Sequence, residues 1–275
     1  MSVSKIKSLI LLILALTVLF LLALVIPSNT AQQRQARQLH EQLSALFATY
    51  DVTLEGETLP AGATICTVEI SAVDERTAAE ALLGTAMQPE ENTSRYEHRY
   101  RSEQGECSFS SSGAIDAALS VSSAVRDPEQ HTQKLLRELS AGTVQTAAAE
   151  NDSGVVTIHV AQQLLGVPVL SDGLMLRYEN GCLRTLTGVL YPLAMPIVRV
   201  SEQTSISCAD ALVRFLACRD QLGWVGSRIL LTEQGYLPAE TASGSIRLLP
   251  VWKIETDTDS FFVNGITREV TLAAA

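Results

Sequence analysis

The chain has 275 residues, and its 20 Lys and Arg against 30 Asp and Glu give a formal net charge of −10 at pH 7. A body this acidic repels nucleic acid and anionic lipid headgroups, so we expect no nucleic-acid partner. Aromatic residues make up only 5% of the chain, so its core must consist mainly of aliphatic side chains, in one large or two small domains.

An uncharged apolar run lies near the start of the chain, from Leu9 to Ile26, and Thr17 is its one polar residue. As a helix, this run is about 27 Å long, close to the roughly 30 Å thickness of a bilayer's hydrocarbon core. A cleaved signal peptide fits less well, because the run is long and Asn29 occupies the position where cleavage requires a small residue. A lipoprotein is excluded because the first cysteine is Cys66. We therefore interpret residues 9–26 as an uncleaved transmembrane anchor.

The flanks of this run predict its orientation. Lys5 and Lys7 precede it, with no acidic residue among residues 1–8. The positive-inside rule therefore predicts a cytoplasmic tail at 1–8 and an extracytoplasmic body in a single-pass protein of the cell membrane. The run has no G-x-x-x-G, so close pairing with another helix would use its small residues, Ala15, Thr17 and Ala23. The alternative is a plain tether that faces lipid.

Residues 27–50 contain the predicted juxtamembrane helix. Its apolar residues follow a 3-4-3-4 spacing over about two heptads: Ala36, Leu39, Leu43, Leu46 and Tyr50. One interpretation is an amphipathic helix that lies on the following domain. The other is a stalk that pairs with itself, as a homodimer, or with another membrane protein through Leu39, Leu43 and Leu46.

Residues 51–142 are predicted to form a first α+β unit. We expect a strand at 63–71, a helix at 75–87, a hairpin of strands 96–101 and 106–111, and a strand at 114–125. Asp127, Pro128 and Gln130 then mark the start of a helix that runs to about Ser140, through a capping box with proline at the first helical position. Residues 143–153 are small and polar, and we interpret them as the boundary between two units.

Residues 154–275 are predicted to form a second α+β unit. A strand at 155–162 precedes a hairpin of strands 173–179 and 182–190, which flank the turn residues Asn180 and Gly181. The capping box at 207–210 opens a helix that ends at Gly223. Strands at 227–233, 245–256, 260–263 and 268–272 follow, and Pro250 indicates an edge strand or a bulge. The fold class is therefore α+β, with antiparallel sheets and helices packed on one face.

Residues typical of catalysis form no recognisable pattern. Hydrolase, zinc-protease and phosphate-loop motifs are absent, and the four histidines (His40, His98, His131 and His159) fall on separate predicted elements. We therefore predict no catalytic, cofactor-binding or metal-binding residues, and no enzyme activity. An enzyme with an unrecognised site is the alternative, which a pocket lined by His159 or Glu179 would favour. The five cysteines cannot all pair, although Cys66 and Cys107 could form a disulfide.

Residues 248–270 resemble the end of a PepSY-like module, as found in thermolysin propeptides. The family pattern has a strand with Pro-x-Trp, a turn, and a closing strand. Pro250 and Trp252 match the first strand, and Thr267 and Glu269 fit the closing run. Asn264 replaces the usual Asp, Gly265 the Ala and Arg268 the Gly. The resemblance implies that Pro250, Trp252, Asn264, Thr267 and Glu269 have structural roles.

The layout of tail, anchor and two α+β units resembles the YycH/YycI family, as do Leu59-Pro60 and the residues Tyr100, Ser102, Gly105 and Phe109 of the first unit. Members are membrane-anchored regulators of a sensor histidine kinase in low-GC Gram-positive bacteria (Firmicutes). The resemblance implies a non-catalytic extracytoplasmic regulator of a two-component system that acts through protein contacts. The alternative is a protease inhibitor or folding assistant of the propeptide kind, which would dock by adding an edge strand.

Overall fold

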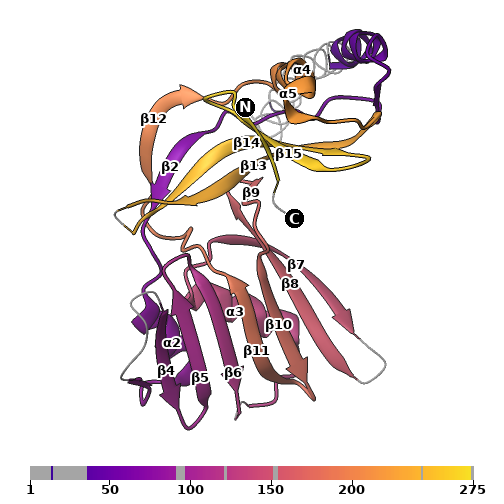
Figure 1. Ribbon diagram of the computed structural model, residues 1–275. Helices are drawn as coiled ribbons and strands as arrows, with labels where there is room; N and C mark the ends of the chain where they lie inside the picture. Colours follow the sequence, from indigo (N-terminus) through magenta and orange to yellow (C-terminus); the bar gives the residue numbers. More distant parts are fainter. Residues whose placement is uncertain are drawn as a thin grey trace, which may run out of the picture.

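The computed structural model describes residue 14 and residues 36–90, 97–120, 123–150, 154–242 and 244–273. These residues form two β-sheets, one above the other in Figure 1. The predicted anchor lies outside them, apart from residue 14. Among the described helices, none combines the length and the apolar character that crossing a membrane requires. The mixed α+β class with antiparallel sheets and few helices is confirmed.

The first sheet, which we name the terminal sheet, contains strands from both ends of the described chain. Its seven strands are β1 (Thr53–Leu54), β2 (Cys66–Ile70), β12 (Val198–Thr204), β13 (Arg228–Glu240), β14 (Ile246–Thr256), β15 (Ser260–Asn264) and β16 (Val270–Leu272). β13 and β14 form a long antiparallel hairpin at its centre. Helices α4 (Cys208–Ala217) and α5 (Arg219–Leu222) follow β12, and a helix over residues 36–48 precedes β1.

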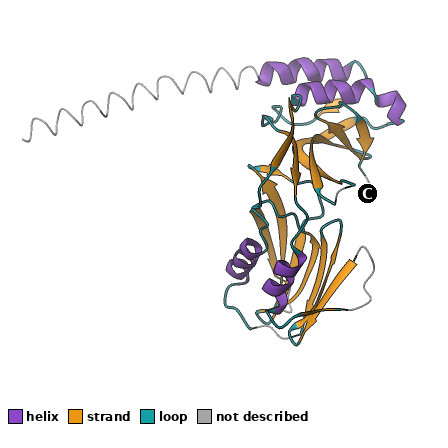
Figure 2. Cartoon of the chain, turned by 90° about the vertical axis from the view of Figure 1, so that its left-hand side faces the viewer, coloured by secondary structure: helices purple, strands orange, loops and turns teal. Residues whose placement is uncertain are grey.

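The second sheet, the middle sheet, is built from the residues between. Its nine strands are β3 (Gln88–Pro89), β4 (Glu97–Ser102), β5 (Gly105–Ser110), β6 (Ala114–Leu119), β7 (Thr143–Glu150), β8 (Val155–Leu164), β9 (Val167–Pro168), β10 (Leu174–Glu179) and β11 (Cys182–Val189). Helices α2 (Glu75–Leu83) and α3 (Pro128–Glu138) lie on one face, and in Figure 2 none of the described helices covers the other.

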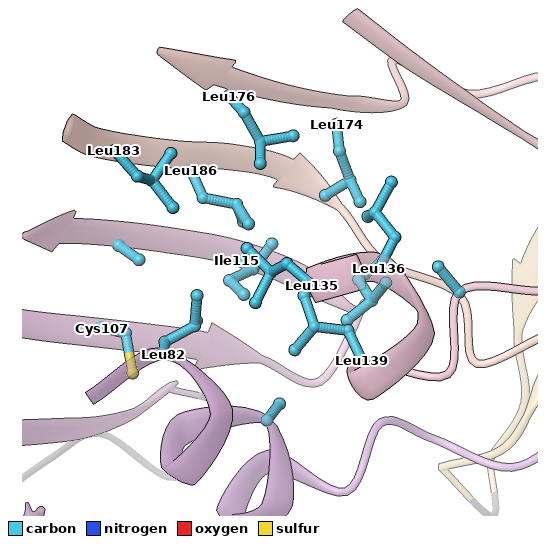
Figure 3. Close-up of a cluster of buried hydrophobic side chains, with 14 of the residues drawn as sticks. Leu82, Cys107, Ile115, Leu135, Leu136, Leu139, Leu174, Leu176, Leu183 and Leu186 are labelled. Atoms are coloured by element: carbon cyan, nitrogen blue, oxygen red, sulfur yellow. The ribbon is translucent and has the colours of Figure 1, made fainter. Parts of the chain in front are cut away.

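The middle sheet and its two helices enclose an aliphatic core, as the composition predicted. Leu82 of α2 and Leu135 and Leu136 of α3 face Leu174 and Leu186 of the sheet (Figure 3). The helices start where the sequence indicated: the side chain of Asp127 accepts a hydrogen bond from the Gln130 N–H at 3.0 Å. The start of each helix is thus fixed by a capping residue next to it in sequence. Which side of the helix is buried depends on the sheet against which it packs.

Strand pairing crosses the boundary expected at residues 143–153. β6, from the first predicted unit, pairs with β11 from the second, and β2 pairs with β14. Residues 143–150 themselves form β7, which pairs along its whole length with β8. β7 is an edge strand, which is held by backbone pairing on one side. Its sequence of small and polar residues lacks the apolar alternation that would have predicted a strand. β12, which was not predicted, is also an edge strand, and most of its side chains are exposed.

Pro250 does not mark an edge strand, because β14 has neighbours on both sides. β2 pairs with β14 at residues 246–248 and β15 pairs with it at residues 251–255. Pro250 lies between these two stretches, where the neighbour changes and no ladder donor is needed. The fold therefore accommodates the missing N–H in the interior of the sheet.

Candidate partner-binding surface

The helix over residues 36–48 packs against α4 at one end of the terminal sheet (Figures 1 and 2). Leu43 and Phe47 are buried in a cluster with Leu212, Phe215 and Trp252. The predicted seam is therefore divided between two environments. Leu43 is 5% exposed, whereas Leu39, Leu46 and Tyr50 are 39%, 38% and 52% exposed. This arrangement matches the interpretation of an amphipathic helix lying on the following domain, with a second apolar flank left in solvent.

The C-terminal end of this helix is fixed by a Schellman motif. The N–H of Val52 donates to the carbonyl of Phe47 at 3.1 Å and that of Asp51 to Ala48 at 3.2 Å. Asp51 has a φ of 58°, the left-handed conformation this motif requires, and Val52 is buried with Phe47. Arg219 also donates through Nη1 to the Tyr50 carbonyl at 2.7 Å, where a helix carries partial negative charge. The helix is thus held firmly at its end nearest β1.

Two polar side chains lie on the buried side of the same helix. The Nδ1 atom of His40 and the hydroxyl of Ser44 are buried and have no hydrogen-bond partner in the part of the chain that the structure describes. Leaving such a group unpaired costs about 1–3 kcal/mol. These two groups therefore reduce the stability that the buried side of the helix gains from packing.

Trp252 and Pro250, two residues of the proposed signature, make contacts with segments that lie between strands. The indole of Trp252 is buried and donates to the Ile206 carbonyl at 2.9 Å. The loop of residues 60–63 passes so close that a Cβ added to Gly62 would lie 2.8 Å from the ring. The Pro250 carbonyl accepts from the Gly265 N–H at 2.7 Å. Trp252 and Pro250 thus tie two connecting segments to the centre of the sheet.

The remaining signature residues form the turn between β15 and β16. The side chain of Asn264 accepts from the N–H groups of Ile266 and Thr267 at 2.9 Å, and its own N–H donates to the Glu269 carbonyl at 2.8 Å. Arg268, which replaces the usual Gly, has a φ of 62°. This is the left-handed region that favours glycine, so the turn holds Arg268 in a conformation that is unfavourable for a residue with a Cβ.

A groove between α2 and α3 was not anticipated from the sequence. It encloses about 430 Å³, and Leu82, Leu119 and Leu135 are among the residues that line it. His131 lies on its wall, with Nδ1 2.9 Å from the hydroxyl of Tyr178. Burial, followed by the charge of Lys134, lowers the pKa of His131. No motif indicated this contact, because it joins residues 47 positions apart.

Other candidate acids, bases and ligands lie apart from one another. His159 is exposed on the uncovered face of the middle sheet, and Glu179 pairs with Arg177 at 2.8 Å. Within the described ranges, no three His, Cys, Asp or Glu side chains gather as metal ligands would. All five cysteines are free; Cys66 and Cys107 belong to different sheets, so the suggested disulfide is not formed. Ala15, Thr17 and Ala23 lie outside the described residues.

Comparison with known proteins shows similarity of fold only. No family model and no curated protein matches the chain. Among solved structures, an uncharacterized protein from Eubacterium rectale has a TM-score of 0.51 at 10% identity, covering 82% of this chain and 91% of that one. The C-terminal domain of YpeB from Bacillus megaterium has a TM-score of 0.36 at 11% identity, covering 75% and 99%. The first of these shows that the arrangement of elements recurs in a protein from Eubacterium rectale.

Proposed function

We propose that this chain is a non-catalytic, single-pass membrane protein that regulates a membrane partner, such as a sensor histidine kinase, through the exposed flank of helix 36–48. The observation that carries the proposal is the division of the apolar seam. Leu43 is buried in the body, whereas Leu39 and Leu46 face solvent, seven residues apart and so on one side of the helix.

The position of the helix supports a partner in the same membrane. It follows the predicted anchor closely in sequence, so a partner's helix emerging from that membrane would run beside it. Its C-terminal half is fixed by Phe47 and Arg219, so the exposed flank is presented in a defined orientation. Burying one leucine side chain stabilises a contact by about 1.5–3 kcal/mol. Two such residues would suffice for a reversible, regulatory interaction.

The resemblance to the YycH/YycI family supports the same proposal, because those proteins are regulators of this kind. The contacts of Trp252 and Asn264 are also consistent with a PepSY-like second unit. On this basis we propose that the body lies outside the cell and that its contacts, rather than a reaction, transmit the signal.

Cross-linking in membranes tests the proposal. Single cysteines at positions 39 and 46 of the full chain, in a Cys182→Ser background, should cross-link to a membrane protein identifiable by mass spectrometry. Leu39→Glu and Leu46→Glu should each abolish co-purification of that protein. Ala45→Glu is the matched control, since Ala45 is exposed on the same helix but on a different side from Leu39 and Leu46. Absence of any cross-linked partner, or equal loss with Ala45→Glu, would count against this proposal.

The second candidate is a propeptide-like protease inhibitor or folding assistant. Residues 230–235 of β13 have no paired strand on their outer side among the described residues, which favours docking of an extended chain. If a protease co-purifies with the chain and still does so with the Leu46→Glu variant, this function would be favoured over the first.

A further inference from the structure

The outer edge of β13 is paired at its start and again at Tyr236, and it is open between these two places. β1 pairs with it in parallel at Arg228 and Ile229. Further along, the Leu170 N–H donates to the Tyr236 carbonyl at 2.8 Å. No strand pairs with residues 230–235 on this side in the described part of the chain. The stretch is therefore a short sheet edge with fixed ends.

The direction of the backbone groups along this gap follows from the ladder on the other side. The Pro250 carbonyl bonds to Gly265, so it points away from β13, and Pro250 is opposite Tyr236. The N–H and C=O of Tyr236 must then also point outward, and alternation extends this to Gln234 and Thr232. In the described chain, no backbone group is hydrogen-bonded to these atoms of Thr232 and Gln234 across the gap. An added strand could reach them through the gap, which β9 borders at its Tyr236 end.

A cavity of about 320 Å³ lies beside these groups. Its walls are mainly apolar and include Pro60, Val167, Pro168, Leu231 and Trp252. Its size is at the lower end for ligand pockets, which suits one large side chain and the adjoining backbone. Glu233 also lines it and forms no ion pair with a described residue. The cross-strand neighbour of Glu233 is Lys253, whose ammonium forms an ion pair with Glu255 instead. The cavity thus combines an apolar pocket with a carboxylate that has no ion-pair partner among the described residues.

The loop of residues 60–63 borders the gap without closing it. The side-chain amide of Gln234 holds this loop: its Oε1 accepts from the Ala63 N–H at 2.6 Å and its Nε2 donates to the Ala63 carbonyl at 3.0 Å. Because a side chain makes these bonds, the backbone groups of Gln234 are left free. The loop therefore stands one side-chain length away from the strand.

The turn that forms the opposite wall contains an unusual residue. Leu165 precedes Gly166 of the cavity wall, has a φ of 53° and is 87% exposed. A left-handed conformation costs a non-glycine residue about 1–2 kcal/mol. Because the side chain of Leu165 is exposed, packing contributes little stability to offset this cost. Leu165 and Gly166 form the two-residue turn between β8 and β9, in which both residues need a positive φ. The turn thus presents an exposed apolar side chain next to the cavity wall.

We propose that this gap receives an extended segment of a partner protein, which adds to β13 as a strand, places an apolar side chain in the cavity and sets a neighbouring Lys or Arg against Glu233. Backbone bonds to Thr232 and Gln234 supply affinity, and the pocket and the carboxylate supply sequence preference. The site is separate from helix 36–48, so the test of this proposal does not depend on the regulatory function proposed for that helix.

Retention of peptide pools on the immobilised full-length protein in detergent tests this proposal. One pool contains six-residue peptides with a central Leu-Lys or Phe-Lys pair and randomised uncharged flanks. The control pool has Glu in place of Lys. We expect the first pool to be retained at least about tenfold more strongly. Equal retention of the two pools, or retention of neither, would overturn the proposal.

Two variants separate binding from folding. Thr232→Pro removes an outward-facing donor and leaves the ladder with β14 intact, so the protein should fold but retain the pool about tenfold less. Leu165→Asn should weaken retention while raising the melting temperature, because asparagine tolerates the left-handed conformation. If both variants retain the pool as strongly as the unmodified chain, the peptides bind elsewhere and the proposed gap is not their site.

Discussion

Gln162 of β8 hydrogen-bonds to both backbone groups of Tyr191, at the point where the chain leaves the middle sheet. Its Oε1 accepts from the Tyr191 N–H at 2.9 Å and its Nε2 donates to the Tyr191 carbonyl at 2.6 Å. The same Nε2 donates to the Ala141 carbonyl at 2.8 Å. Gln162 is only 2% exposed, so this one amide satisfies backbone groups that have no access to water.

Gln162→Leu should therefore lower the free energy of unfolding by about 3 kcal/mol, because three buried backbone groups lose their partner at once. Urea unfolding of the full chain in detergent measures this. Gln163→Leu is the control, since Gln163 is half-buried and points to the opposite face of β8. A loss of less than about 1 kcal/mol for Gln162→Leu would mean that water replaces the amide.

Asp51→Gly should raise the free energy of unfolding by about 0.5–1 kcal/mol. Asp51 holds the left-handed position of the Schellman motif, where glycine has no Cβ penalty. Ala48→Gly, inside the same helix, should have the opposite sign and lower stability by about 1 kcal/mol. Thermal unfolding distinguishes the two. If Asp51→Gly is destabilising, the aspartate contributes a contact beyond its backbone conformation.

Asp74→Ala should destabilise the protein by about 1 kcal/mol at neutral pH, the usual value of a helix N-cap. The Asp74 carboxylate accepts from the hydroxyl of Thr77 at 2.7 Å and from its N–H at 3.2 Å, and the hydroxyl bond is the larger cause of its lowered pKa. A lowered pKa in the folded state means that this stability is present above the unfolded-state pKa and is lost as the pH falls through the folded value. The difference between Asp74→Ala and the unmodified chain should therefore vanish in acid. A difference that persists there would indicate a packing effect.

The thiols should differ sharply in reactivity. Burial raises the pKa of both Cys107 and Cys208 to about 12, and Cys66 and Cys218 are also buried. Cys182 is only half-buried. At pH 8, a maleimide should label one thiol in the folded protein and five after denaturation, because the exposed thiolate reacts. Cys182→Ser should remove the native labelling. Rapid labelling of Cys107 would instead show that the middle sheet opens locally.

Much of the local structure could be predicted because its causes lie within a few residues. Asp127 and Ser207 cap the helices that their capping boxes indicated, and Gly223 ends α5 in the left-handed conformation. The hairpin around Asn180 and Gly181 forms with the expected strands. These features depend on short-range hydrogen bonds and on the φ values that each residue type tolerates, so a sequence window contains them.

The candidate surfaces were only partly predictable. The 3-4-3-4 spacing correctly indicated an amphipathic helix, which covers residues 36–48, but it did not show that Leu43 is buried whereas Leu39 and Leu46 are exposed. The open edge of β13 depends on where β1 and Leu170 pair, at positions far from β13 in sequence. Spacing gives the faces of one element, whereas exposure depends on which other elements cover them.

The sequence by itself determined the acidic charge, the α+β class, the helix caps and the turn types, since each of these is set by composition or by neighbouring residues. Only the tertiary structure decided that β2 joins β14, that residues 143–150 pair as a strand, and that His131 meets Tyr178. Such contacts link segments distant in sequence, and many alternative pairings satisfy the same local pattern. Their selection depends on the packing of all the side chains at once, which no short stretch of sequence specifies.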